Sequence, residues 1–145
     1  MKNTLKILSL VFVSLFMNVN AQDEITNRQQ FQNVENIEKS YINKPLKEFL
    51  KGLKLEIKSV SYIREDESGP NRIILRFDDR ETYAKLGQEN IVPARITVYF
   101  INDMATKSIF NKLNQYGTIE ENPIEQFKEL KIQKLLGSNN HKMKF

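Results

Sequence analysis

Hydrophobic residues recur at helical spacing in two segments near the start of the patterned region. The first segment contains Val34, Ile37 and Tyr41, and their spacing predicts one helix. The second segment starts with Asn43 as the expected cap and Pro45 in the first turn. Its apolar stripe predicts a second helix that ends near Gly52 and is formed by Leu46, Phe49, Leu50 and Leu53.

Alternation of hydrophobic and polar residues then predicts three strands. The first, within residues 55–62, changes phase near residues 58–59, which predicts a bulge. The turn residues 68–71 separate it from the second strand, so these two strands are expected to form a hairpin. The third strand covers residues 95–100. The core sides of the second and third strands are predicted to consist of Ile73, Leu75, Phe77, Ile96, Val98 and Phe100.

The remaining pattern favours two C-terminal helices. One starts at Asp103 as its cap and ends near Gly117, and the other starts at residues 122–125 and ends at Gly137. The predicted fold class is therefore α+β, with N-terminal helices, a three-stranded largely antiparallel sheet and two C-terminal helices packed on one sheet face.

The segment RFDDRETYAKLG, residues 76–87, concentrates three acids at the end of the second strand. Asp78 and Glu81 have the spacing of a capping box, and Asp79 is the alternative cap of the same short helix, residues 79–86. A catalytic carboxylate pair is less favoured because neighbouring residues at a strand end point to opposite sides. A calcium site is also less favoured because few oxygen ligands are present and the order of an EF-hand loop is missing. The acids are thus expected to shape the chain.

The N-terminus has the pattern of a secretory signal peptide, residues 1–21. Lys2 and Lys6 precede an apolar run, residues 7–17, which is too short to span a bilayer comfortably. Cleavage is expected between Ala21 and Gln22. The alternative is an uncleaved anchor. We therefore expect an exported protein, periplasmic or secreted, with no stable membrane span after cleavage. The expected division is a flexible leader at residues 22–32, a single α+β domain at residues 33–137 and a flexible basic tail at residues 138–145.

Composition and charge remove several classes of chemistry. Loss of Lys2 and Lys6 would lower the formal charge from +4 to +2, which is too small to favour a nucleic-acid partner. The chain has no cysteine, so disulfides, thiol catalysis and thiolate metal sites are excluded. The single histidine, His141, lies in the predicted tail, and the five glycines stand singly. The sequence therefore predicts no catalytic triad, no phosphate-binding glycine loop, no cofactor and no metal site.

The strands carry a second pattern on the side opposite the predicted core. Strict alternation places Arg72, Arg76, Arg95 and Tyr99 on that side. Arginine and tyrosine are enriched where proteins meet partners, and arginine pairs bidentately with carboxylate or phosphate. We expect these four residues to bind an anionic ligand or an acidic protein partner in the envelope, and the alternative is a merely solvated face. The expected function is a small exported non-enzymatic binding protein; the alternatives are a small hydrolase with an Asp/Glu-based site and an inhibitor or immunity-type protein.

Overall fold

The fold is an antiparallel sheet packed on one side by short helices, as shown by a computed structural model that describes residues 24–67 and 69–143. The predicted signal peptide and its Ala21–Gln22 cleavage site lie outside the described residues. Within the described part of the chain, no helix is long and apolar enough to cross a membrane. All buried hydrophobic residues of this part belong to one cluster.

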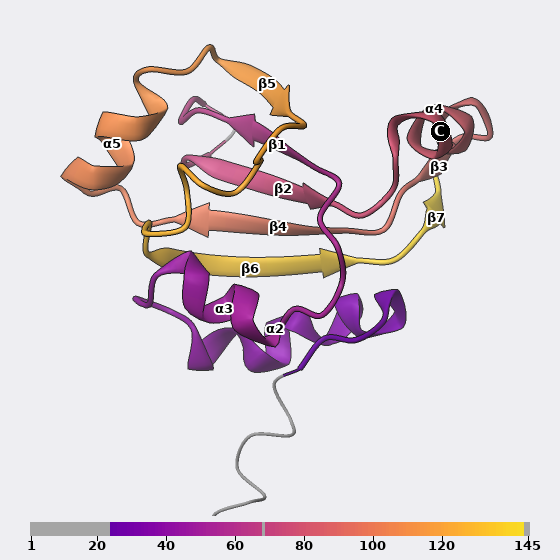
Figure 1. The fold of residues 1–145 in the computed structure, drawn as a ribbon, viewed down its shortest axis with the longest axis horizontal. Coiled ribbons are helices and arrows are strands. Elements are labelled where there is room, and N and C mark those ends of the chain that lie inside the picture. Colours follow the sequence, from indigo (N-terminus) through magenta and orange to yellow (C-terminus); the bar gives the residue numbers. More distant parts are fainter. Residues whose placement is uncertain (1–23, 68, 144–145) are drawn as a thin grey trace, which may run out of the picture.

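Five strands form the large sheet in the spatial order β5, β1, β2, β4, β6 (Figure 1). Every neighbouring pair is antiparallel. A second sheet of two antiparallel strands, β3 (Ile91–Val92) and β7 (His141–Lys142), lies beyond one end of the large sheet. The strands of the large sheet are β1 (Ser59–Ile63), β2 (Arg72–Arg76), β4 (Arg95–Phe100), β5 (Tyr116–Ile119) and β6 (Ile132–Ser138).

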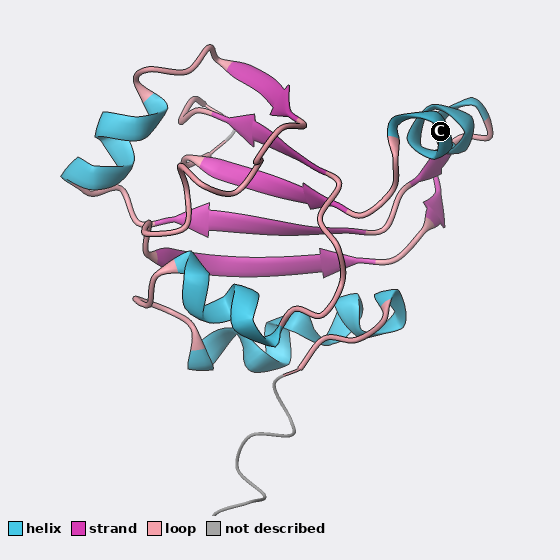
Figure 2. Ribbon diagram, in the orientation of Figure 1, coloured by secondary structure: helices cyan, strands magenta, loops and turns pink. Residues whose placement is uncertain are grey.

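The helices are short; some lie beside β6, and others lie at the two ends of the strands (Figure 2). A nearly continuous helical segment is followed by α3 beside β6, α4 lies at the end of the sheet next to β3, and α5 precedes β5. The helical segments are η1 (Arg28–Asn33), α2 (Val34–Ile37), η2 (Glu38–Ser40), α3 (Leu46–Gly52), α4 (Arg80–Gln88) and α5 (Met104–Phe110).

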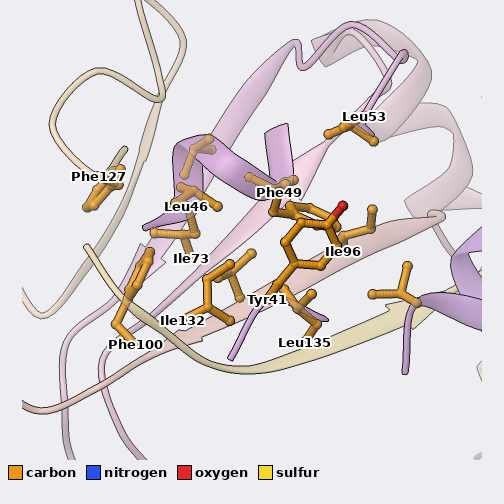
Figure 3. Packing of buried hydrophobic residues seen from close by; sticks show 14 of the residues in the cluster. Tyr41, Leu46, Phe49, Leu53, Ile73, Ile96, Phe100, Phe127, Ile132 and Leu135 are labelled. Carbon is orange, nitrogen blue, oxygen red and sulfur yellow. The ribbon is translucent and has the colours of Figure 1, made fainter. Parts of the chain in front are cut away.

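The core fills the space between the sheet and the N-terminal helices. Figure 3 shows Tyr41, Leu46 and Phe49 gathered against Ile96 and Leu135 of the sheet. The rings of Tyr41 and Phe49 meet edge to face, with their centroids 5.4 Å apart. Beside them, a second aromatic group joins β4, α5 and the β5–β6 connection, and it consists of Phe100, Phe110 and Phe127.

The prediction of an α+β protein is confirmed, and so are the second helix, the hairpin of β1 with β2, and the alternation of β2 and β4. Asn43 is not the cap of this helix, because Pro45 is the N-cap residue and the Asn43 N–H donates to the Ile132 carbonyl instead. The first strand, however, begins only at Ser59, so Leu55 and Ile57 precede it and pack against the core from outside the sheet. The phase change in the sequence therefore marks the start of the strand.

The prediction of a three-stranded sheet with two C-terminal helices is wrong. The helix expected up to Gly117 ends at Phe110, and Tyr116–Ile119 forms β5. The last predicted helix is a series of turns followed by β6, in which Ile132 and Leu135 are buried. Short apolar runs spaced three or four residues apart do not distinguish a helix from an irregular segment and a bulged strand. A register shift at Tyr99 and Phe100 lets Ile132 and Leu135 face the same core.

Gly137 was expected to end a helix, but it lies inside β6 for a different reason. A Cβ atom at this position would be only 1.7 Å from the carbonyl oxygen of Phe31. The absence of a side chain thus allows η1 to lie directly on β6.

Both predicted flexible segments contribute to the folded structure where they are described. Ile25 and Phe31, within the expected leader, are 3% and 0% exposed. His141 and Lys142, within the expected tail, pair with β3. The core therefore begins before residue 33. The sequence pattern misses this because only two of the residues at 22–32, one on each side of a polar stretch, are large and apolar.

Candidate functional site

The side of the large sheet opposite the core, here called the outer face, is organised in three rows across the strands. The four residues expected there, Arg72, Arg76, Arg95 and Tyr99, alternate with buried neighbours on β2 and β4, and all four are half-buried. The row nearest α4 contains Ser59, Arg76, Arg95 and Ser138; the middle row contains Thr118, Ser61, Ile74, Thr97 and Leu136; the far row contains Tyr116, Ile63, Arg72, Tyr99 and Lys134.

Arg76 and Arg95 are direct cross-strand partners in the row nearest α4. Directly opposite residues in an antiparallel pair have Cβ atoms roughly 4.5–5.5 Å apart, and like charges at this distance destabilise the pair. Neither arginine takes part in an ion pair within the described residues. Two arginines therefore start from adjacent strand positions, and neither has a carboxylate at ion-pair distance in the described residues.

The guanidinium group of Arg76 lies over the ring of Tyr83, 4.2 Å from the ring centroid. This distance is within the range of a cation–π contact. The contact restricts the position of the Arg76 guanidinium group above the ring. The Nε atom of Arg76 is buried and has no hydrogen-bond partner in the described structure.

Tyr83 reaches Arg76 because Asp79 starts α4 at the end of β2. The Thr82 backbone N–H donates to Asp79 Oδ1 over 2.8 Å. Hydrogen bonds from the backbone and side chain of Thr82 lower the pKa of Asp79. The alternative prediction, Asp79 as the cap, is thus confirmed.

Asp78, the first choice as the cap, has another role. Its Oδ1 atom is 2.7 Å from Arg28 Nη1, and Arg28 Nη2 donates to the Phe77 carbonyl over 2.8 Å. The Asp78 side chain is only 7% exposed. Arg28 comes from η1, in the segment expected to be a flexible leader, so no local pattern around residue 78 predicts this contact.

A cavity of about 370 Å³ opens between α4 and the row of the outer face nearest to it. Its lining combines three basic and three acidic side chains with the Tyr83 ring: Lys58, Ser59, Arg76, Asp78, Asp79, Arg80, Tyr83, Ala84 and Glu120. Two of the acids are engaged in the cap and in the ion pair with Arg28. The described residues contain no group of three or more side chains suited to hold a metal ion.

The four residues predicted as one site form two separate pairs. Arg72 and Tyr99 are cross-strand partners in the far row, with 6.0 Å between the guanidinium carbon and the ring centroid. Arg76 is four residue steps from Arg72, which corresponds to about 13 Å along β2. The sequence prediction also missed Lys58, Tyr83 and Glu120. The one available signal was the capped helix after β2, which turns Tyr83 back toward the strand end.

Comparison with known proteins adds no family to these observations: the chain matches no protein-family model, and no curated protein or solved structure is significantly similar to it.

Proposed function

We propose that the chain is a small exported, non-enzymatic binding protein, and that Arg76 and Arg95 recognise a carboxylate or phosphate group of its ligand or partner. The observation that carries this proposal is the cross-strand pair of arginines without an ion-pair partner in the described residues. An anion bound between the two guanidinium groups would offset their mutual repulsion.

The contact between Arg76 and Tyr83 supports binding rather than a purely solvated face. A stacked guanidinium loses less conformational freedom on binding than a mobile one, and its planar fork matches carboxylate and phosphate oxygens. The adjacent cavity, which Arg76 lines and Arg95 does not, offers room for the group that carries the anion. Arg80 is a further cation there, whereas Lys58 pairs with Glu56 over 2.6 Å. Glu120, which also lines the cavity, would disfavour a second negative charge on the ligand.

A hydrolase with an Asp/Glu-based site has less support. General acid–base catalysis by two carboxylates requires both groups to face the reacting bond. Asp79 is held by the backbone of α4, and Asp78 is held by Arg28. An inhibitor or immunity-type role would use the same arginine pair against an acidic protein surface.

The test compares two double variants that each remove two positive charges. Arg76→Ala/Arg95→Ala changes the proposed site, and Lys39→Ala/Lys107→Ala changes two exposed lysines elsewhere. The probes are sodium sulfate and a hexaglutamate peptide, titrated at low ionic strength. Binding is followed by NMR through the backbone amide signals in every variant, and also through the arginine Nε–H signals where Arg76 and Arg95 are present. We expect the signals of Arg76 and Arg95 to shift in the wild type and in the lysine variant, with affinity for the peptide reduced at least about tenfold in the arginine variant.

Circular dichroism would verify that both double variants fold. Equal binding of hexaglutamate by the folded arginine variant and the wild type would overturn the proposed function.

A further inference from the structure

The cavity beside α4 has a buried carboxylate in its wall, and one oxygen of this carboxylate lacks a donor. Asp78 lines the cavity, and its side chain is only 7% exposed. Arg28 divides its two terminal nitrogen atoms between Asp78 Oδ1 and the Phe77 carbonyl. Asp78 Oδ2 is buried and has no hydrogen-bond partner in the described part of the chain. A buried acceptor without a donor destabilises the site, and a donor supplied by a ligand would remove this cost.

Arg76 contributes an unpartnered donor to the wall of the same cavity. Its Nε atom is buried without a partner among the residues described, and its guanidinium group is held over the Tyr83 ring. Arg76 and Asp78 are two residues apart, which is at most about 7 Å between their Cα atoms. The cavity therefore has a donor and an acceptor, both without partners, on two neighbouring side chains.

A second carboxylate reaches the cavity from the end of β5. Ser59 is opposite Arg76 on β2, and Val60 is opposite Ile119 on β5. Glu120 follows Ile119, so it continues the row of Ser59 and Arg76 at a distance of about 10 Å, or two strand spacings, from Arg76. Glu120 is exposed and forms no ion pair with any residue that the structure describes. The cavity thus has acidic groups on both sides of its central arginine.

We propose that the ligand of this cavity is a small zwitterion, an α-amino acid. Its carboxylate is bound by Arg76, and its ammonium group donates to Asp78 Oδ2 on the side of the cavity that also faces the charge of Glu120. The carboxylate half rests on the proposed function, and the ammonium half is new. The two groups of an α-amino acid are bonded to one carbon atom, so both reach side chains that are two residues apart. A hydrogen bond from an ammonium group to a carboxylate is charge-assisted and therefore strong.

The charges around the cavity favour a zwitterion over a simple anion. The lining contains three basic and three acidic side chains, so these charges sum to zero. A ligand with one charge of each sign keeps this balance, whereas a simple anion adds a negative charge close to Asp78 and Glu120. The volume of about 370 Å³ is near the lower end of the roughly 300–1,000 Å³ of small-molecule sites, which suits a ligand of this size.

Three probes separate the two charged groups of the ligand. L-alanine carries both groups, propanoate lacks the ammonium group, and L-alaninamide lacks the carboxylate. The methyl side chain is small enough that its fit does not decide the comparison. Each probe is titrated into the wild-type chain at pH 7 and followed by NMR through the backbone amide signals. We expect L-alanine to bind at least about fivefold more tightly than either of the other two probes.

Three variants test which carboxylate binds the ammonium group. Asp78→Asn keeps an oxygen for Arg28 but replaces the second oxygen by an NH₂ donor, so affinity for L-alanine should fall at least about fivefold while propanoate binds as before. Glu120→Gln should lower the affinity for L-alanine about twofold to threefold, because an exposed charge is screened by solvent. The matched control is Glu121→Gln, which neutralises an exposed acid outside the lining of the cavity and should bind L-alanine like the wild type.

The outcomes separate this inference from the proposed function. If the wild type binds L-alanine no more tightly than propanoate, or if folded Asp78→Asn keeps the wild-type affinity for L-alanine, the zwitterion is overturned and the anion site stands. If propanoate, sulfate and hexaglutamate all fail to bind, the proposed function fails as well. Circular dichroism checks the folding of each variant. Should Asp78→Asn not fold, equal binding of L-alanine by Glu120→Gln and Glu121→Gln overturns the inference.

Discussion

The edge strands β5 and β6 each carry a glycine on the core side, and the two glycines are surrounded differently. Gly137 of β6 lies against the Phe31 carbonyl group, where an added Cβ atom would be 1.7 Å from a backbone oxygen. Gly117 of β5 lies against the end of the Tyr62 side chain, where an added Cβ atom would be 2.3 Å from the phenol oxygen. At Gly137 the neighbouring group is the backbone of η1, which can move only if the whole helix moves. At Gly117 the neighbouring group is the Tyr62 side chain, which can rotate about its own bonds.

This difference shows where the stability of the fold is concentrated. On the β6 side, η1, α2 and α3 bury large side chains, including Phe31, Leu46 and Phe49. The strand β5 has no fully buried residue. The β6 edge is therefore the part of the sheet that substitutions should affect most, and β5 is the part that they should affect least.

The largest expected effect comes from adding a methyl group at each glycine. Gly137→Ala should lower the free energy of unfolding by about 3 kcal/mol or more, because η1 must move away from β6. Gly117→Ala should lower it by about 1–2 kcal/mol, because rotation of Tyr62 relieves part of the overlap. Urea denaturation of both variants, followed by far-ultraviolet circular dichroism, measures the difference.

Equal losses of stability at the two glycines would show that the backbone of η1 yields as easily as the Tyr62 side chain. The comparison of the two edges would then be wrong.

An intermediate effect is expected for the carboxylate that covers the β6 edge. Glu38→Ala leaves the Leu135 N–H without its acceptor in a part-buried position, which typically costs about 1–3 kcal/mol. Glu38→Gln keeps an acceptor oxygen and should cost less. The two variants are compared by urea denaturation and by hydrogen exchange of the Leu135 amide.

Faster exchange of the Leu135 amide in Glu38→Ala than in Glu38→Gln is the specific signature of the lost acceptor. Identical exchange in both variants would mean that other groups protect this edge.

The parts of the fold that sequence predicts well are those whose signals are local. The apolar stripe of α3, the turn between β1 and β2, and the alternation along β4 each lie within a dozen residues. For the same reason, the outer positions of Arg76 and Arg95 follow from strand alternation alone. Their contact as direct neighbours requires the register of β2 with β4, which no local pattern specifies.

The parts that sequence missed depend on partners distant in the chain. Arg28 pairs with Asp78 fifty residues away, and Glu38 accepts from Leu135 ninety-seven residues away. The spacing of Leu130, Leu135 and Leu136 fits a helix as well as it fits a strand that starts after a turn. Pairing with β4 favours the strand, because it supplies hydrogen-bond partners to the backbone of β6 and at the same time buries the Leu135 side chain.

The smallest expected effect concerns α5, the helix that leads toward β5. The Thr106 backbone N–H donates to Asp103 Oδ1 over 2.9 Å, and this hydrogen bond is the main cause of the lowered pKa of Asp103. Asp103→Ala removes the cap and should cost about 1 kcal/mol, whereas Asp103→Asn keeps an acceptor at the same position.

The pKa of Asp103 in the folded chain is below the ordinary aspartate value of about 3.9, so the charged carboxylate stabilises the fold at pH values above about 3.9. This contribution disappears as the pH falls through the lower, folded-state value. The stability difference between the wild type and Asp103→Asn should therefore be constant from pH 7 to pH 5 and shrink below about pH 4. Urea midpoints at pH 7, 5, 4 and 3 provide the measurement, and a difference that persists unchanged to pH 3 would show that the Asp103 charge does not contribute to the cap.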